Sequence, residues 1–205
     1  MRSTLLRATG SKRGTLTVNE PKQRHAVFLD RDGTIAEDVG YLNHHSRLHV
    51  YSYSAAAIRR LNEAGLPVVV VTNQAGVARG YFPEELVQHV NEKMIAELAA
   101  GGARVDAIYY CPHDDKDNCA CRKPRPGMLL RAAREHRLTV RGSWMVGDRH
   151  SDMEMAHAAG CRSILVLSGY GRGEYEWHRT EWKQQPGHVV ENLAAAVDII
   201  LKESR

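Results

Sequence analysis

The sequence predicts one α/β domain built on a doubly wound, mostly parallel sheet. Three observations favour this fold. Short apolar runs recur along the chain, helical patterns separate them, and several of the runs end on polar residues of the same kinds. Repeated strand–helix units of this type fold as parallel sheets with helices on both faces. A chain of 205 residues suits one domain, or one domain with a small insertion.

The spacing of apolar residues along the chain predicts the individual strands and helices. The runs expected to form strands are short and largely β-branched: residues 26–29, 66–73, 104–110, 143–148 and 163–167. Apolar stripes at helical spacing predict helices over these ranges: 53–61, 86–98, 128–133, 152–159 and 189–203. Residues 31–50 form a polar, histidine-rich excursion, and we expect residues 169–188 to be a long polar loop.

Charge and composition exclude several classes of protein. The net charge of +4 is mild, and six basic residues precede His25. We therefore expect a flexible basic arm at 1–24 before a catalytic domain at 25–205, and no nucleic-acid partner. No apolar run suits a signal peptide or a membrane span, and crowded cysteines favour a reduced cytoplasm. We expect a cytoplasmic monomer with no membrane partner.

Polar residues at the expected strand ends predict the chemistry. These positions hold carboxylates, a hydroxyl group, amides and cations: Asp30, Arg31, Asp32, Thr72, Asn73, Gln74, Arg122, Lys123, Asp148, Arg149 and Asp152. Carboxylates this close repel each other unless a cation lies between them, and oxygen ligands suit Mg²⁺. Phosphoryl transfer needs such a metal, a nucleophile and positive charge around the transferring group. Asp30 is positioned to attack phosphorus.

Asp32 decides the type of reaction. Forming an aspartyl-phosphate from a phosphate monoester requires protonation of a poor alkoxide leaving group, and hydrolysis of that intermediate requires a base. One carboxylate can serve as the acid and then as the base. The pair Asp30 and Asp32 therefore predicts a phosphatase.

Four segments in this order, "DRDGT", "VVVTNQ", "CRKP" and "VGDRHSD", resemble the four motifs of the haloacid dehalogenase superfamily of phosphohydrolases. The resemblance implies that Asp30 is the nucleophile, Asp32 the general acid/base, and Thr72 and Lys123 phosphate stabilisers. It also implies that Asp30, Asp32 (through its backbone carbonyl) and Asp148 bind magnesium. Asp152 either orients the waters of that metal or serves as a favourable charge at a helix N-terminus.

A cysteine-rich loop predicts a second metal site. "CPHDDKDNCAC" provides four potential ligands within eleven residues: Cys111, His113, Cys119 and Cys121. Three sulfurs and an imidazole match tetrahedral zinc, and a complete ligand set indicates a structural site. We expect this site to order the loop that presents Arg122 and Lys123. Cys161 lies far from it and is expected in the core.

The loop resembles that of the D-glycero-D-manno-heptose 1,7-bisphosphate phosphatases and of the histidinol-phosphate phosphatases, both of which lack a large cap domain. "EDVGYL" and "TNQAGVARGYF" resemble the heptose group. Arg149 is similar to the histidinol group, and the five-residue loop spacing fits that group at least as well as the heptose group. The heptose resemblance implies a small phosphorylated sugar as substrate. It also implies these substrate-binding residues: Asp38, Val39, Gly40, Tyr41, Asn73, Gln74, Ala75, Arg122 and Arg149. Histidinol-phosphate hydrolysis is the alternative, and a zinc-stabilised nucleic-acid-binding module is a less favoured one.

Overall fold

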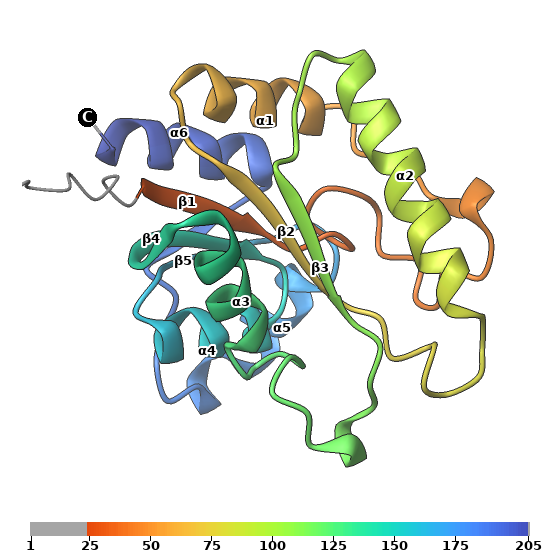
Figure 1. Cartoon of the computed structure of the whole chain (residues 1–205). Helices are drawn as coiled ribbons and strands as arrows, with labels where there is room; N and C mark the ends of the chain where they lie inside the picture. The colour runs from red at the N-terminus through yellow and green to blue at the C-terminus, as the bar shows by residue number, and fades with distance from the viewer. Residues whose placement is uncertain (1–23, 205) are drawn as a thin grey trace, which may run out of the picture.

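Six parallel strands form one sheet in the computed structural model, which describes residues 24–204 (Figure 1). Their order across the sheet is β3-β2-β1-β4-β5-β6. The strands span these residues: β1 (Arg24–Leu29), β2 (Val68–Asn73), β3 (Ala107–Cys111), β4 (Leu138–Gly147), β5 (Arg162–Val166) and β6 (His188–Val190). The predicted parallel α/β fold is confirmed.

Helices cover both faces of this sheet. The α-helices are α1 (Ser54–Glu63), α2 (Glu84–Ala100), α3 (Gly127–His136), α4 (His150–Ala159), α5 (Gly171–His178) and α6 (Leu193–Glu203). Short 3-10 helices occupy η1 (His45–Arg47), η2 (Asp115–Asp117) and η3 (Arg179–Glu181). Buried residues of α1, α2 and α6 pack with one face of the strands, and those of α3 and α4 pack with the other (Figure 1).

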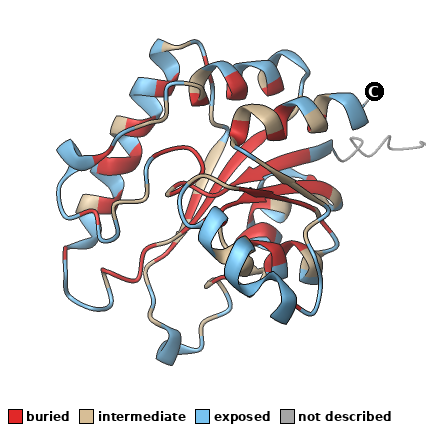
Figure 2. Cartoon of the chain, turned by 180° about the vertical axis from the view of Figure 1, so that it is seen from behind, coloured by how far each residue is buried: buried red, intermediate tan, exposed pale blue. Residues whose placement is uncertain are grey.

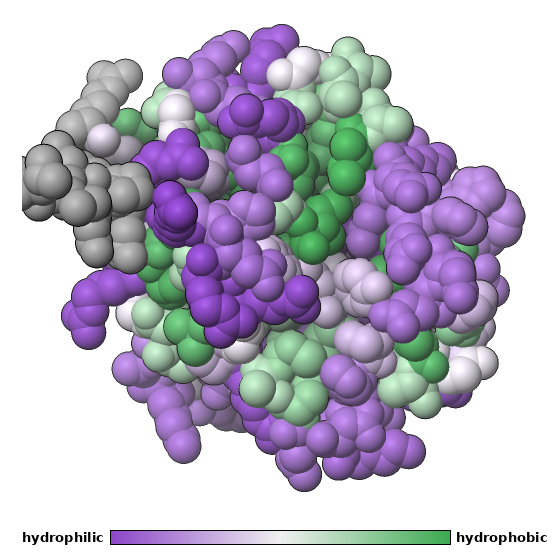
Figure 3. All heavy atoms as spheres, in the orientation of Figure 1, coloured by the Kyte–Doolittle hydropathy of each residue, from purple (hydrophilic) through white to green (hydrophobic). Residues whose placement is uncertain are grey.

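The apolar pattern of the sequence explains these layers. Residues 26–29 of β1 and 68–71 of β2 are wholly buried, because helices cover both sides of the central strands. Figure 2 shows buried residues along the strands and on the sheet-facing sides of the helices. Hydrophilic residues cover most of the face seen in Figure 1, with smaller apolar areas between them (Figure 3).

The strand order creates a crevice at the carboxyl ends of β1 and β4. The chain leaves β1 toward β2 and β3, and after β3 it crosses back to the other side of β1 to form β4. Such a reversal opens a ligand crevice outside the strand ends. The backbone amide of Asp30 donates to the carbonyl of Val146 at 2.9 Å, so the two strand ends are held together at this point.

The structure corrects the expected loop at 169–188. This segment contains α5 and η3, and its Trp182 packs with Met153 and Leu165 in a small apolar cluster. The helix expected at 189–203 is also divided, because β6 includes Val189 and α6 begins only at Leu193. α5 spans eight residues and β6 spans three, and elements this short carry too few apolar repeats for a clear period.

The proposed arm at 1–24 lies outside the described residues except for Arg24, the first residue of β1. The division into an arm and a domain at 25–205 therefore stays a prediction. Within residues 24–204, none of the helices combines the length and apolarity needed to cross a lipid bilayer.

Candidate active site

Three carboxylates converge at the crevice between β1 and β4. Oxygen atoms of Asp30, Asp148 and Asp152 all lie within 4.8 Å of one another. Asp30 directly follows β1, Asp148 follows β4, and Asp152 lies in the first turn of α4. Oδ1 of Asp148 is buried and has no hydrogen-bond partner among residues 24–204. An orphaned carboxylate oxygen beside two further carboxylates suits a hard cation.

The ammonium group of Lys123 lies against this cluster. Its Nζ is 2.9 Å from Oδ1 of Asp30 and 2.7 Å from Oδ1 of Asp152. Asn73 fixes the lysine backbone, because its Oδ1 accepts from the amide of Lys123 at 3.1 Å and its Nδ2 donates to the carbonyl at 3.4 Å. Although burial lowers the pKa of Lys123, the charges of Asp152 and Asp30 raise it above its usual value. Lys123 is therefore a fixed cation.

Burial and mutual repulsion disfavour the charged forms of two carboxylates. Desolvation, opposed by the charge of Lys123 and reinforced by that of Asp152, raises the pKa of Asp30 to about 7. Desolvation, followed by repulsion from Asp30 and Asp152, raises the pKa of Asp148. A cation at this point would remove both penalties.

Asp32 lies beside the cluster and is held by the loop after β2. The amide Nε2 of Gln74 lies 2.9 Å from Oδ2 of Asp32 and 2.9 Å from Oγ1 of Thr72. One glutamine thus connects two residues that the sequence assigned to catalysis. Gln74 itself was predicted to bind substrate.

A cleft of about 520 Å³ opens in front of these groups. Most of the predicted site residues line it: Asp30, Asp32, Asp38, Gly40, Tyr41, Thr72, Asn73, Gln74, Ala75, Arg122, Lys123 and Arg149. Asp148 and Asp152 lie beneath the cleft and are fully buried. Val39 is placed elsewhere, because it packs against the apolar core.

Arg79 also lines the cleft, and sequence reasoning did not single it out. Its guanidinium contacts the hydroxyl group of Tyr41 and donates to both carboxylate oxygens of Asp114, at 3.1 and 2.7 Å. It therefore joins the β1–α1, β2–α2 and cysteine-rich loops. The sequence did hold a signal for Arg79, because this residue lies inside the segment "TNQAGVARGYF" that resembles the heptose group. Only the fold shows which loops meet at its side chain.

Tyr170 is a second cleft residue that the sequence did not identify. The guanidinium of Arg149 lies over its ring, 3.7 Å from the centroid. Arg149 also reaches Asp38 at 3.4 Å and Glu174 at 3.8 Å. Burial lowers the pKa of Arg149, but Asp148, Asp38 and Glu174 together raise it. The segment expected to be a loop thus contributes Tyr170 to the cleft lining.

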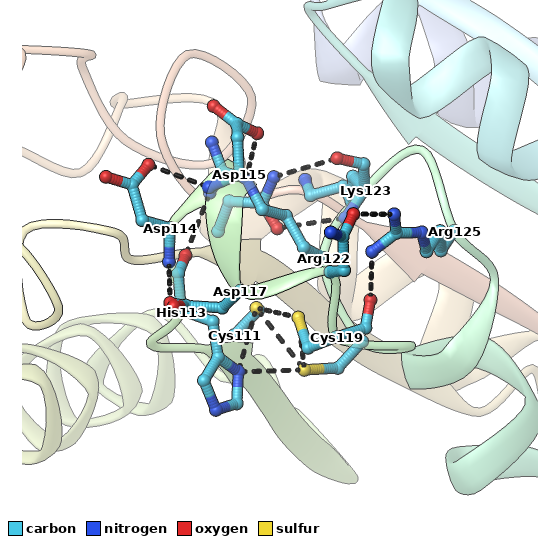
Figure 4. Close-up of polar contacts among 12 residues, drawn as sticks. Cys111, His113, Asp114, Asp115, Asp117, Cys119, Arg122, Lys123 and Arg125 are labelled. Carbon is cyan, nitrogen blue, oxygen red and sulfur yellow. Dashed lines mark hydrogen bonds and ion pairs between the residues drawn. The ribbon is translucent and has the colours of Figure 1, made fainter.

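The cysteine-rich loop brings its four predicted ligands together. The sulfurs of Cys111, Cys119 and Cys121 lie 3.3–3.5 Å apart, and Nδ1 of His113 is 3.3 Å from the Cys121 sulfur. All four ligand atoms lie within 4.8 Å of one another, a cluster that could hold a metal ion. Figure 4 shows Cys111, Cys119 and His113 gathered on one side of the loop, with Asp114, Asp115 and Arg122 on the other.

Acidic residues of this loop hold arginines of the cleft. Nε of Arg122 donates to Oδ1 of Asp115 at 2.5 Å, and Arg79 is bound by Asp114. The hydrogen bond from Arg79 is the largest effect that holds the pKa of Asp114 below its usual range. The thiol cluster and the cleft are therefore parts of one connected loop system.

Comparisons with known proteins agree with this geometry. A family model described as "HAD-hyrolase-like" matches residues 120–196. The D-glycero-D-manno-heptose-1,7-bisphosphate 7-phosphatase of Thermosynechococcus vestitus is 39% identical over 192 residues, which cover 86% of this chain and 95% of the relative. The D-glycero-beta-D-manno-heptose-1,7-bisphosphate 7-phosphatase of Photorhabdus laumondii is 44% identical over 177 residues, covering 82% of this chain and 91% of the relative.

A solved structure is similar over nearly the same range. The D,D-heptose 1,7-bisphosphate phosphatase of B. bronchiseptica, complexed with magnesium and phosphate, superposes with a TM-score of 0.80 at 38% identity. The match covers 87% of this chain and 99% of the other. The predicted resemblance and the predicted enzyme class are confirmed. This chain is a phosphatase and belongs to the heptose-bisphosphate phosphatase family of the haloacid dehalogenase-like hydrolases.

Proposed function

We propose that this phosphatase removes the C7 phosphate of D-glycero-D-manno-heptose 1,7-bisphosphate and leaves the C1 phosphate in place. The observation that carries the proposal is the charge of the cleft: beside the carboxylates and Lys123, it is lined by Arg79, Arg122 and Arg149. Lys123 suffices for the transferring phosphate, so planar guanidinium groups are left to bind a second one. The curated relatives named above act on a substrate of this kind.

The carboxylate cluster fits Mg²⁺. Asp30, Asp148 and the backbone carbonyl of Asp32 would hold the ion, and the unpartnered Oδ1 of Asp148 supplies one of the oxygen ligands. When bound, the metal would neutralise negative charge on the phosphoryl oxygens and on the carboxylates. Asp152 is not needed as a direct ligand, because both of its oxygens accept hydrogen bonds: Oδ1 from Lys123 at 2.7 Å and Oδ2 from the amide of Arg149 at 3.1 Å.

In the first half of the reaction, a carboxylate oxygen of Asp30 forms a bond to phosphorus. The bond from phosphorus to the sugar oxygen breaks, and Asp32 gives that oxygen a proton. Lys123, from the loop between β3 and α3, and Thr72, near the end of β2, stabilise the charge on the transferring group. Lys123 is suited to this role because Asp152 and Asn73 fix its position.

In the second half, Asp32 removes a proton from water while the water oxygen bonds to phosphorus. The aspartyl–phosphate bond breaks, which restores the carboxylate of Asp30 and releases inorganic phosphate. The proton on Asp32 then serves the next turnover, so the cycle balances with water as the only other reactant.

We propose that Cys111, His113, Cys119 and Cys121 hold a structural zinc ion. Tetrahedral zinc with sulfur at about 2.3 Å requires sulfurs roughly 3.7 Å apart, close to the observed 3.3–3.5 Å. The complete ligand set leaves no position for substrate. Thiolate ligands persist in a reducing compartment, which supports a cytoplasmic location.

Substrate position is the second part of the proposal. Arg122 contacts the phosphate that does not react, and Arg149, held by Asp38 and Tyr170, provides a second guanidinium in the cleft lining. Tyr41, Gly40 and the segment Asn73–Ala75 shape the sugar pocket, as their place in the cleft lining supports.

Phosphorus NMR of the product mixture tests the position of attack. We expect the resonance of the C7 phosphate to be replaced by that of inorganic phosphate, with the C1 resonance retained. Arg122→Ala should lower kcat/KM for the bisphosphate far more than for an aryl phosphate, because the lost contact is to the group that does not react. Asp30→Asn, the control for the covalent step, should reduce both activities to background. A higher kcat/KM for histidinol phosphate than for the bisphosphate would contradict the proposed substrate.

A further inference from the structure

Arg31 is a buried arginine for which the proposed reaction has no use. It lies between Asp30 and Asp32, and only 1% of its side chain is exposed. Removing a guanidinium from water is costly unless its donors are satisfied and its charge is paired. An arginine in this place therefore needs well-defined partners.

The principal partner is the carboxylate of the neighbouring Asp32. Nε of Arg31 donates to Oδ1 of Asp32 at 3.1 Å, and its NH2 group donates to Oδ2 at 2.9 Å. Two parallel hydrogen bonds to one carboxylate fix its plane as well as its position. A lysine at position 31 could supply the charge but not this planar fork.

Asn91 fixes the other end of the guanidinium. Its Oδ1 accepts from NH1 of Arg31 at 3.0 Å, across 60 positions of sequence. Asn91 lies on α2 within the buried stripe Val87, Val90, Met94 and Leu98, where it is the single polar member. An amide in an apolar stripe is retained at low cost only if it is hydrogen-bonded. Here its bond holds Arg31 toward Asp32.

The hydrogen bonds distinguish the two oxygens of Asp32. Oδ2 accepts from Arg31 and also from Nε2 of Gln74 at 2.9 Å, which occupies both of its lone pairs. Within the described part of the chain, Oδ1 accepts only from Nε of Arg31. A carboxylate oxygen has two lone pairs, so Oδ1 keeps one available for a proton.

We propose that Arg31, fixed by Asn91, is a positioning residue that holds Asp32 so that its proton is given and taken at Oδ1. The inference rests on the proposed function of Asp32 as the general acid/base. In the first step, Asp30 bonds to phosphorus, the bond from phosphorus to the leaving oxygen breaks, and the proton on Oδ1 moves to that oxygen. In the second step, the oxygen of water bonds to phosphorus, the aspartyl–phosphate bond breaks, and Oδ1 receives a proton from the water. The bond from Nε uses the other lone pair of Oδ1 and persists throughout.

A pair of substrates that differ only in the leaving group tests this role. Phenyl phosphate has a poor leaving group that needs a proton, whereas 4-nitrophenyl phosphate has a good one that does not. The rate at which phenol or 4-nitrophenol is released is measured over the first turnover. The proteins compared are the wild type, Asn91→Ala, Arg31→Lys and Asp32→Asn. We expect Asn91→Ala and Arg31→Lys to slow phenyl phosphate roughly 10²-fold more than 4-nitrophenyl phosphate, within the range of general acid catalysis.

Two further variants separate positioning from loss of structure. Asn91→Asp retains an acceptor oxygen for Arg31 and should preserve the wild-type ratio of the two rates. Ser143→Ala removes a buried acceptor for the amide of Ala26, 2.8 Å away at the far end of β1, and should also preserve this ratio. Circular dichroism and thermal unfolding confirm that each variant folds. If Asn91→Ala is unfolded, Arg31→Lys and Asn91→Asp supply the comparison.

The outcomes separate this inference from the proposed function on which it rests. Equal slowing of both substrates in Asn91→Ala and Arg31→Lys, or no slowing, overturns the positioning role if Asp32→Asn changes the ratio. If Asp32→Asn leaves the ratio unchanged, the acid/base assignment itself is wrong, and the inference is overturned with it. The test is independent of the natural sugar substrate.

Discussion

The ammonium group of Lys123 lies 2.7 Å from a carboxylate oxygen of Asp152, and both side chains are buried. Asp152 also accepts from the backbone amide of Arg149 at 3.1 Å, so the same carboxylate serves the first turn of α4. The sequence left open whether Asp152 orients the waters of the metal or serves as a charge at a helix N-terminus. Its contact with the amide of Arg149 fits the second interpretation, and its contact with Lys123 is one that the sequence did not predict. Its place beneath the cleft suggests that it positions Lys123.

Asp152→Asn tests whether Asp152 positions Lys123 for catalysis. The amide keeps the shape of the carboxylate but removes its charge, so Lys123 loses one of two carboxylate partners. We expect kcat for an aryl phosphate to fall by about 10–100-fold, the usual effect of changing a residue that orients a catalytic group. Asp198→Asn is the matched control: it breaks an exposed ion pair to Arg60 and should leave kcat unchanged. Equal activity of the two variants would argue against the positioning of Lys123 by Asp152.

The raised pKa of Asp30 predicts a pH-dependent stability of the metal-free protein. The pKa is about 7 in the folded state and 3.8 for a free aspartate, so the folded state holds this proton more tightly. Between about pH 4 and pH 7 the folded protein binds more protons than the unfolded chain. The free energy of unfolding should therefore decrease as the pH rises through this window.

Thermal unfolding in EDTA measures this effect. Asp30→Asn removes the titrating group, so the melting temperature of the variant should fall less than that of the wild type between pH 4.5 and pH 7.5. At pH 7.5 the variant should melt at the higher temperature. Adding Mg²⁺ should stabilise the wild type most at high pH, where Asp30 has lost its proton. Parallel pH profiles for the two proteins in EDTA would contradict the prediction.

The thiol cluster predicts a second metal that resists brief chelation. Elemental analysis after mild EDTA treatment should find about one zinc per chain, and Mg²⁺ alone should restore activity. Cys119→Ser should lose the zinc and lower the melting temperature, because a structural site contributes directly to folding. Cys161→Ser, which changes the cysteine outside the cluster, should retain zinc. Full activity in a preparation free of zinc would show that the loop needs no metal.

The contacts of Arg79 predict that this residue links the cysteine-rich loop to binding of the bisphosphate. Arg79→Ala removes its contacts to Tyr41 and Asp114 at the cleft rim. We expect KM for the bisphosphate to rise about tenfold, with KM for 4-nitrophenyl phosphate nearly unchanged, since a charge-assisted hydrogen bond contributes roughly 1.5 kcal/mol. Arg172→Ala breaks an exposed pair with Glu191 away from the cleft lining and is the control. An equal change of KM for both substrates would place the role of Arg79 outside recognition of the second phosphate.

Much of the fold and of the site could be predicted because its signals are local. The apolar runs before Asp30 and before Thr72 predict buried strands from local sequence alone. Parallel strands then bring their carboxyl ends to one edge of the sheet. The cysteine cluster needed only the spacing of four ligands. The two short elements β6 and α5 could not be predicted in this way, since they depend on tertiary contacts. Tyr175 of α5 and Val189 of β6 pack against the cluster of Met153, Leu165 and Trp182.

The sequence by itself determined which chemical groups gather at the strand ends: Asp30, Asp32, Lys123 and Asp148 follow strands or lie in loops that reach the same edge. Only the tertiary structure decided how those groups are held. Asn91 reaches Arg31 because α2 packs over the loop after β1, and Arg79 reaches Asp114 because two loops meet at the cleft. Hydrogen bonds between residues so far apart in the sequence depend on how the helices and loops pack together. A hydrophobic pattern encodes which faces are buried, and it does not encode which polar atoms then come within 3 Å of each other.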